Sequence, residues 1–124
     1  GLNDMAWHSV TEPVADEVSV FEDKAMTSTE LFDRVETSCM STAFSHIFAG
    51  GYGAGYYGYK WAEVLDADAF DAFKSAGIFN KEVAKSFKEN ILEKGGSDHP
   101  MNLYLKFRGK EPSIEPLLKR SGLK

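Results

Sequence analysis

A glycine-rich run in the middle of the chain interrupts any regular secondary structure there. The run is Ala49-Gly50-Gly51-Tyr52-Gly53-Ala54-Gly55, in which four of the seven residues are glycine. Glycine accepts positive φ angles, and it loses more conformational freedom on folding than any other residue. The run therefore predicts a loop that separates the structured segments on either side of it.

Helical signals follow this loop to the end of the sequence. The predicted helices cover residues 56–76, 81–94, 100–108 and 113–120. Gly77 is placed to end the first in a left-handed conformation, and Asn80 to cap the second. Pro100 suits the first turn of the third. Glycines also mark the ends of the others, so the helical region is expected to run from residue 56 to residue 124.

Three helices are also predicted before the loop. Thr11 and Pro13 are typical of a helix start, and the apolar residues after them recur at helical spacing to Ala25. The spacing of Thr27-Ser28-Thr29-Glu30 is that of a capping box, which predicts a short helix containing Leu31, Phe32 and Val35. Residues 38–48 fit one or two further amphipathic turns.

The fold class that follows is all-α, in a single domain over residues 1–124. No run alternates apolar and polar residues over strand length, and no Asn-Gly or Asp-Gly hairpin turn occurs. At 124 residues the chain is long enough to bury a core. The residues expected to form that core are Trp61, Leu65, Phe70, Phe73, Phe87 and Leu103.

Charge and composition exclude several classes of partner. The formal net charge of −5 argues against nucleic acid, because binding phosphates requires a basic surface. No apolar run approaches the roughly 20 residues that span a bilayer, so no membrane partner is expected. The single cysteine, Cys39, cannot form an internal disulfide. It fits a cytoplasmic protein and is compatible with the periplasm too.

The tyrosines of the loop are the strongest candidates for ligand contact. A phenol combines a flat apolar face with a hydroxyl that donates a hydrogen bond, and glycines let a loop close over a ligand. A surface linker between helices explains the same composition equally well. Gly53, Gly55 and Gly58 also spell GxGxxG, but a dinucleotide site requires a preceding strand, which the pattern does not predict.

No metal site is expected within the chain itself. Its three histidines, His8, His46 and His99, are far apart in sequence, and neither HExxH nor CxxC occurs.

A longer segment resembles a known family. It reads FSHIFAGGYGAGYYGYKWAEVLDADAF, over residues 44–70. It resembles the C-terminal signature of the thimet-oligopeptidase family of zinc metallopeptidases, and within it the bacterial peptidyl-dipeptidase (dipeptidyl carboxypeptidase) branch. The likeness extends to Met5-Ala6-Trp7-His8 and to residues 95–97 and 108–112. It implies that the chain is a compact helical C-terminal part of a larger, mostly helical zincin-type peptidase.

The resemblance also implies roles for the loop, residues 49–59. Tyr59 matches a residue that stabilises the transition state. His46, Tyr52 and, more weakly, Tyr56 match substrate-binding residues. Gly50 and Gly51 would let the loop close on a peptide substrate.

The family's zinc, its HExxH motif and its third ligand, a glutamate, are expected upstream of Gly1. The fragment itself is then expected to bind no metal and to be inactive alone. It is also expected to self-associate through the apolar helix faces that would normally pack on the missing catalytic half. The proposed activity is cleavage of short peptides, with removal of C-terminal dipeptides favoured over internal cleavage. The alternative is a free-standing helical interaction module without catalytic activity.

Overall fold

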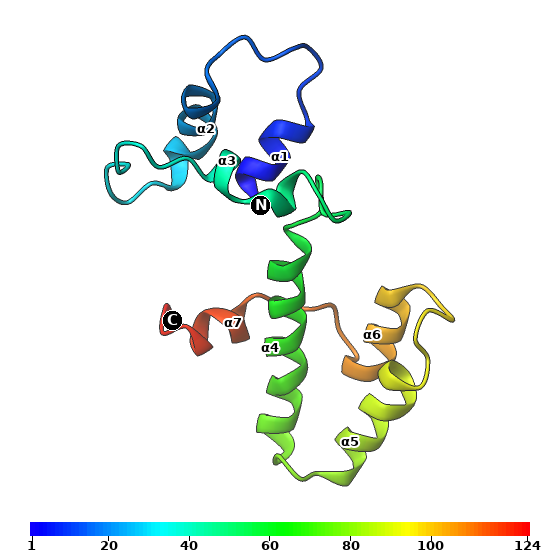
Figure 1. Ribbon diagram of the computed structural model, residues 1–124. Helices are drawn as coiled ribbons and strands as arrows, with labels where there is room; N and C mark the ends of the chain where they lie inside the picture. The colour runs from blue at the N-terminus through cyan, green and yellow to red at the C-terminus, as the bar shows by residue number, and fades with distance from the viewer. The chain divides into compact units, whose positions relative to one another are not determined.

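The computed structural model describes all 124 residues as an all-helical chain (Figure 1). It contains no strand, which confirms the predicted all-α class. The α-helices are α1 (Leu2–His8), α2 (Val18–Met26), α3 (Met40–Ala43), α4 (Gly58–Ala76), α5 (Lys81–Phe87), α6 (Pro100–Arg108) and α7 (Glu115–Arg120). No helix is both long enough and apolar enough to cross a membrane.

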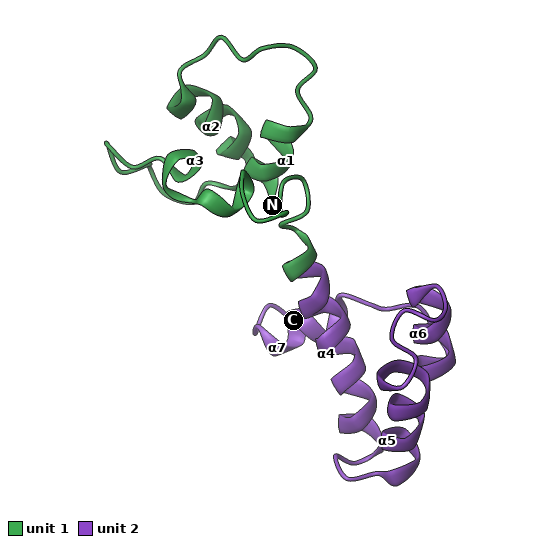
Figure 2. Cartoon of the chain, turned by 45° about the vertical axis from the view of Figure 1, so that its right-hand side comes forward, with its two compact units in different colours: residues 1–59 green, residues 60–124 purple.

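Two compact units divide the chain, Gly1–Tyr59 and Lys60–Lys124 (Figure 2). We refer to them as unit 1 and unit 2. The boundary falls within the first turn of α4.

Unit 2 follows the local signals in its sequence closely. Gly77 adopts a φ of 101° directly after α4, and Asn80 caps α5 by accepting hydrogen bonds from two backbone N–H groups. Pro100 occupies the first turn of α6, which Gly109 ends at a φ of 70°. A π-helical turn, Lys88–Leu92, extends α5 by one further turn. The four helices predicted here are therefore confirmed.

The core of unit 2 differs in part from the expected one. Leu103 is buried as predicted, together with Val64, Ala67 and Tyr104, and Phe73, Phe87 and Phe107 pack ring against ring. Trp61 and Phe70 are each 46% exposed, so their placement in the core was wrong. Both lie on α4, nine residues apart and therefore on opposite sides of the helix. α7 lies on the opposite side of α4 from α6 (Figure 1).

A buried carboxylate joins α4 to α6. Asp68 is fully buried and accepts hydrogen bonds from the Tyr104 hydroxyl (2.6 Å) and from Arg108 Nε (2.9 Å). Burial by itself raises the pKa of Asp68, but these two donors outweigh it and leave that pKa below its ordinary value.

Unit 1 contains shorter helices than predicted, and two predictions there were wrong. The helix expected from Thr11 begins only at Val18, because Glu17 still has an extended backbone (ψ 144°). Short helices are stabilised mainly by packing. Helix α2 packs against α1 through Phe21 and Trp7, whose ring centroids lie 4.0 Å apart.

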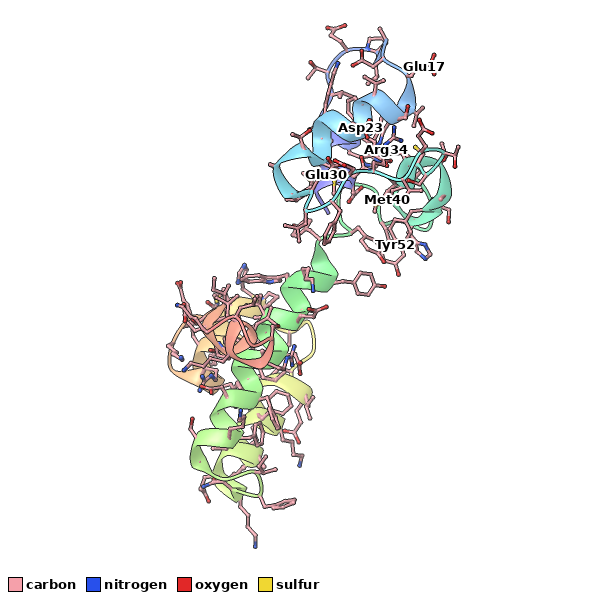
Figure 3. The ribbon with its side chains drawn as sticks, turned by 90° about the vertical axis from the view of Figure 1, so that its left-hand side faces the viewer. Glu17, Asp23, Glu30, Arg34, Met40 and Tyr52 are labelled. Atoms are coloured by element: carbon pink, nitrogen blue, oxygen red, sulfur yellow. The ribbon has the colours of Figure 1, made fainter.

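The capping box at Thr27 does not open the predicted helix over Leu31, Phe32 and Val35 either, since Thr27–Thr29 forms only a 3₁₀ turn. The Thr27 and Thr29 hydroxyls hydrogen-bond to carbonyl groups of the preceding turn, so they close α2. Leu31 and Phe32 after them are each 87% exposed. This segment is tied to α2 by the Arg34–Asp23 ion pair (2.9 Å), whose residues Figure 3 labels.

Candidate functional site

The glycine-rich loop forms a series of tight turns between two helical segments of unit 1. A 3₁₀ turn, Ser45–Ile47, precedes it, and α4 begins at Gly58. Gly50 and Gly51 have φ angles of 74° and 79°, which only glycine adopts readily. The predicted loop is confirmed, and its reversal at these two glycines brings Tyr52 back beside His46.

Five aromatic residues gather around this reversal, and we call them the aromatic cluster: Phe44, His46, Tyr52, Tyr56 and Tyr59. The His46 ring lies 5.5 Å from Tyr52 and 6.1 Å from Tyr56. The Tyr56 ring lies 5.2 Å from Tyr59 and 4.8 Å from Phe44. The four side chains that the sequence singled out are therefore neighbours in space. Tyr52 is labelled in Figure 3.

Two phenols of the cluster are hydrogen-bonded to each other. The Tyr52 and Tyr59 hydroxyl oxygens lie 2.9 Å apart, and Tyr59 is 55% exposed. A phenol has one proton, so one hydroxyl donates to the other and a single O–H stays free for a ligand. The hydrogen bond with Tyr52, together with repulsion between the two phenolates, raises the pKa of Tyr59 above its ordinary value. Tyr59 therefore keeps the proton that a hydrogen-bond donor needs.

A buried carboxylate holds the loop from the side of α1. Asp4 is fully buried, and its two carboxylate oxygens accept the backbone N–H groups of Ala54 (2.9 Å) and Tyr56 (3.0 Å). Burial by itself raises the pKa of Asp4, but the N–H groups of Tyr56 and Ala54 and the neighbouring His8 outweigh it. The pKa of Asp4 thus lies below its ordinary value, and the carboxylate is ionised at neutral pH.

His8 lies one helical turn after Asp4 and contacts both it and the loop. Its Nδ1 is 2.8 Å from the carbonyl oxygen of Asp4 and 2.9 Å from Asp4 Oδ1. Both atoms accept hydrogen bonds only, so Nδ1 bears a proton. The other ring nitrogen faces Gly53, where an added Cβ would stand only 2.9 Å from it. A side chain larger than that of glycine at position 53 would have to displace the His8 ring.

Few features of the sequence indicate that Asp4 and His8 contact the loop. Asp4 and His8 lie at i and i+4 on one helix face, but the loop residues that they contact are about 50 positions away in the chain. Nothing within the loop indicates which distant carboxylate binds it.

A second buried carboxylate, Glu22, holds α3 in the same unit. It accepts hydrogen bonds from the Ser41 hydroxyl (2.6 Å) and from the backbone N–H groups of Met40 and Ser41. The Ser41 oxygen accepts in turn from Asn3 Nδ2 (2.9 Å) and Trp7 Nε1 (2.8 Å). Asn3 and Trp7 of α1 therefore help to hold α3, whereas Asp4 and His8 of the same helix hold the loop.

The residues of this chain do not suit a zinc ion or a dinucleotide. No three His, Cys, Asp or Glu side chains lie close enough together to hold a metal. The Asp4–His8 pair stands alone, and both Asp4 oxygens already accept hydrogen bonds from the loop. Gly53, Gly55 and Gly58 follow a helical turn rather than a strand, so the context of a dinucleotide fingerprint is missing.

The chain is all-helical, and its glycine-rich loop brings three phenols and a histidine together at or near the surface of unit 1. Comparison with known proteins gives the family. The model of Peptidase family M3 matches residues 1–123, so the chain belongs to that family.

Several relatives are similar to this chain over most of its length. Oligopeptidase A of Escherichia coli (strain K12) is 58% identical over 82 residues, which are 66% of this chain and 12% of that protein. Dipeptidyl carboxypeptidase of Salmonella typhimurium (strain LT2) is 40% identical over 124 residues, covering 98% of this chain and 18% of that protein. Saccharolysin of Saccharomyces cerevisiae is 38% identical over 82 residues, or 65% of this chain and 11% of that protein. The chain thus spans less than a fifth of the length of these relatives.

Proposed function

We propose that unit 1 supplies the substrate-binding side of a zinc-dependent peptidase active site. In this proposal the zinc ligands lie in a part of the polypeptide outside residues 1–124. Family membership and the convergence of His46, Tyr52, Tyr56 and Tyr59 support the proposal. The exposed phenol pair is the observation that carries it, because it offers one free donor on an accessible surface.

Tyr59 is assigned the stabilisation of the transition state. When a nucleophile attacks a peptide carbonyl, negative charge develops on the carbonyl oxygen. A phenol about 2.7–3.1 Å from that oxygen stabilises the charge more in the transition state than in the bound substrate. Tyr59 fits because its hydroxyl is exposed, already paired with a neighbour, and protonated at neutral pH.

The other loop residues are assigned to binding the peptide. Tyr52 and His46 lie next to each other and offer hydrogen-bonding groups for the substrate backbone, and Tyr56 supplies an apolar ring beside them. Gly50 and Gly51, at positive φ, place no side chain where the peptide backbone would approach. Zinc, when bound by the complete enzyme, would supply an activated water molecule.

The substrates proposed are short peptides, with removal of their C-terminal dipeptides. Two relatives that match 98% of this chain are named dipeptidyl carboxypeptidase, whereas those named oligopeptidase A match about two thirds of it. Hydrolysis of a peptide with a free C-terminus, compared with hydrolysis of the same peptide with an amidated C-terminus, distinguishes removal of C-terminal dipeptides from internal cleavage. Release of dipeptides from the free form alone supports the proposal, and equal internal cleavage of both forms contradicts it.

The experiment that tests the role of Tyr59 is Tyr59→Phe in the full-length peptidase. Loss of the donor is expected to lower kcat by about 10²–10³-fold, the usual cost of removing one oxyanion donor. Steady-state hydrolysis of a fluorogenic peptide measures it.

Tyr57→Phe is the matched control, because Tyr57 is a loop tyrosine with a similar exposure (57%) that is assigned no role in the site. It is expected to change kcat by less than about twofold. Normal turnover in Tyr59→Phe would remove the assigned role.

A further inference from the structure

The strongest feature outside the aromatic cluster itself is the contact between α1 and the loop. We propose that Asp4 and His8 are positioning residues, which hold the loop backbone so that the Tyr52 and Tyr59 phenols stay paired and aimed at the substrate. This inference rests on the proposed function for its catalytic consequence. The contact itself is a property of unit 1 alone.

The first part of the argument is the shape of the backbone that Asp4 binds. Ala54 has a φ of 58°, a left-handed conformation that few residues other than glycine adopt. A turn that contains such a residue can point nearby backbone N–H groups toward one side, where they bind an anion. The Asp4 carboxylate fills it with one oxygen on Ala54 N–H and the other on Tyr56 N–H. An internal anion thus offsets the strain at Ala54.

The second part is the position of the two anchored residues relative to the phenols. Tyr56 is anchored through its backbone, and its ring contacts both Tyr52 (5.8 Å) and Tyr59 (5.2 Å). Gly55, between the anchored residues, donates its N–H to the Tyr52 carbonyl at 2.8 Å. The bound carboxylate therefore fixes the turn whose two ends bear the paired phenols.

The third part is the close approach of His8 to the loop. Its ring stands against Gly53, where an added Cβ would lie 2.9 Å from Nε2, and its protonated Nδ1 lies 2.9 Å from Asp4 Oδ1. The imidazole therefore limits where the loop backbone lies and supports the carboxylate that binds it. Mispositioning a reacting group by about 1 Å can cost 10²-fold in rate, so such support has a measurable effect on catalysis.

The catalytic test is a double-mutant cycle in the full-length peptidase between Asp4→Asn and Tyr59→Phe. Asparagine has the same shape, but its NH₂ group would face one of the two backbone N–H donors. Asp4→Asn alone is expected to lower kcat/KM by about 10- to 100-fold. If Asp4 acts through the phenols, the same change costs less than about threefold once Tyr59 is phenylalanine.

Glu22→Gln is the matched control for loss of stability. Glu22 is the other buried carboxylate of unit 1, and it binds the backbone of Met40 and Ser41 instead of the loop. Its substitution is expected to lower kcat/KM by the same factor with and without Tyr59→Phe. If Asp4→Asn behaves in this additive way too, Asp4 is only a structural residue and the proposal is wrong.

A second pair of variants tests His8 without altering any charge. Gly53→Ala places a methyl group against the His8 ring, and it is expected to lower kcat/KM by about tenfold or more. Gly58→Ala, five residues later, meets no atom within 4 Å and is expected to change kcat/KM by less than about twofold. Equal activity in the two variants would remove His8 from the proposal.

Amide hydrogen exchange tests the contact independently of any activity. In the 124-residue chain, Asp4→Asn is expected to speed exchange of the Ala54 or Tyr56 amide by at least about tenfold. The Gly109 amide, which bonds to Leu105 in unit 2, is expected to keep its rate. Unchanged protection at Ala54 and Tyr56 overturns the proposal. If Asp4→Asn changes the protection of these amides but the full-length protein has no peptidase activity, the contact is supported and the proposed function is contradicted.

Discussion

The two units both contain fully buried aspartates, but these aspartates bind different kinds of donor. Asp4 in unit 1 accepts from backbone N–H groups of the loop, whereas Asp68 in unit 2 accepts from the side chains of Tyr104 and Arg108. In unit 1 the carboxylate therefore determines the conformation of a segment that has no regular structure of its own. In unit 2 it joins two helices that their own sequences already specify.

This difference matches what each unit has to do in the proposed function. A substrate-binding loop needs glycines to make its turns, and glycines leave its backbone poorly determined by local preference. A distant carboxylate supplies the missing restraint through Ala54 and Tyr56. Unit 2 presents no such loop, and its buried charge serves helix packing.

The largest expected effect concerns the ion pair of unit 2. Arg108→Met removes the cation 2.9 Å from the fully buried Asp68 and leaves only the half-exposed Lys110, 3.6 Å away. Breaking a buried pair in this way typically costs about 3–5 kcal/mol. The free energy of unfolding of the chain in urea measures the loss.

The matched control is Arg120→Met, because the Arg120–Asp66 pair is solvent-exposed, with side-chain exposures of 46% and 67%. Exposed pairs contribute only about 0–1 kcal/mol. Equal losses of stability in the two variants would show that the burial of Asp68 does not determine how much Arg108 stabilises the chain. The contrast between the two units would then lose its support.

The same contrast explains which parts of the fold the sequence could predict. The helices of unit 2 begin and end at local signals such as Gly77, Asn80 and Pro100, and they were predicted nearly to the residue. In unit 1 two comparable signals were misleading. The Thr27 hydroxyl bonds backwards to Asp23, and six of residues 11–17 are exposed, so little packing supports a helix there.

The candidate site shows the same limit in another form. Glycine content predicted the loop, and the family resemblance pointed to His46, Tyr52, Tyr56 and Tyr59, which the structure brings together. Their roles in catalysis remain a prediction. The Asp4 anchor was missed because it depends on a contact between residues about 50 positions apart, which no local pattern records.

A smaller effect tests the value of local signals directly. Asn80 accepts the N–H groups of Glu82 (3.0 Å) and Val83 (3.1 Å), so Asn80→Ala is expected to cost about 1 kcal/mol of stability. Thr11→Ala is the control, since Thr11 looked like a cap in the sequence but precedes no helix. It is expected to change stability by less than about 0.5 kcal/mol. Thermal unfolding of the two variants compares them, and a comparable loss at Thr11 would restore the helix predicted there.

The smallest expected effect concerns the acidity of the site phenol, and it again separates the two units. The pKa of Tyr104 in unit 2 is raised first by burial and then by the hydrogen bond to Asp68, whereas that of the exposed Tyr59 is raised first by its hydrogen bond with Tyr52. Removing the neighbouring hydroxyl therefore tests the cause at Tyr59 alone. Tyr52→Phe is expected to bring the pKa of Tyr59 down toward about 10, the value of a free tyrosine. NMR titration of the Tyr59 ring measures it, and Tyr57→Phe is expected to leave it unchanged. If the pKa of Tyr59 stays raised without the Tyr52 hydroxyl, the phenols are not coupled. The single free donor assigned to the pair would then become two independent ones.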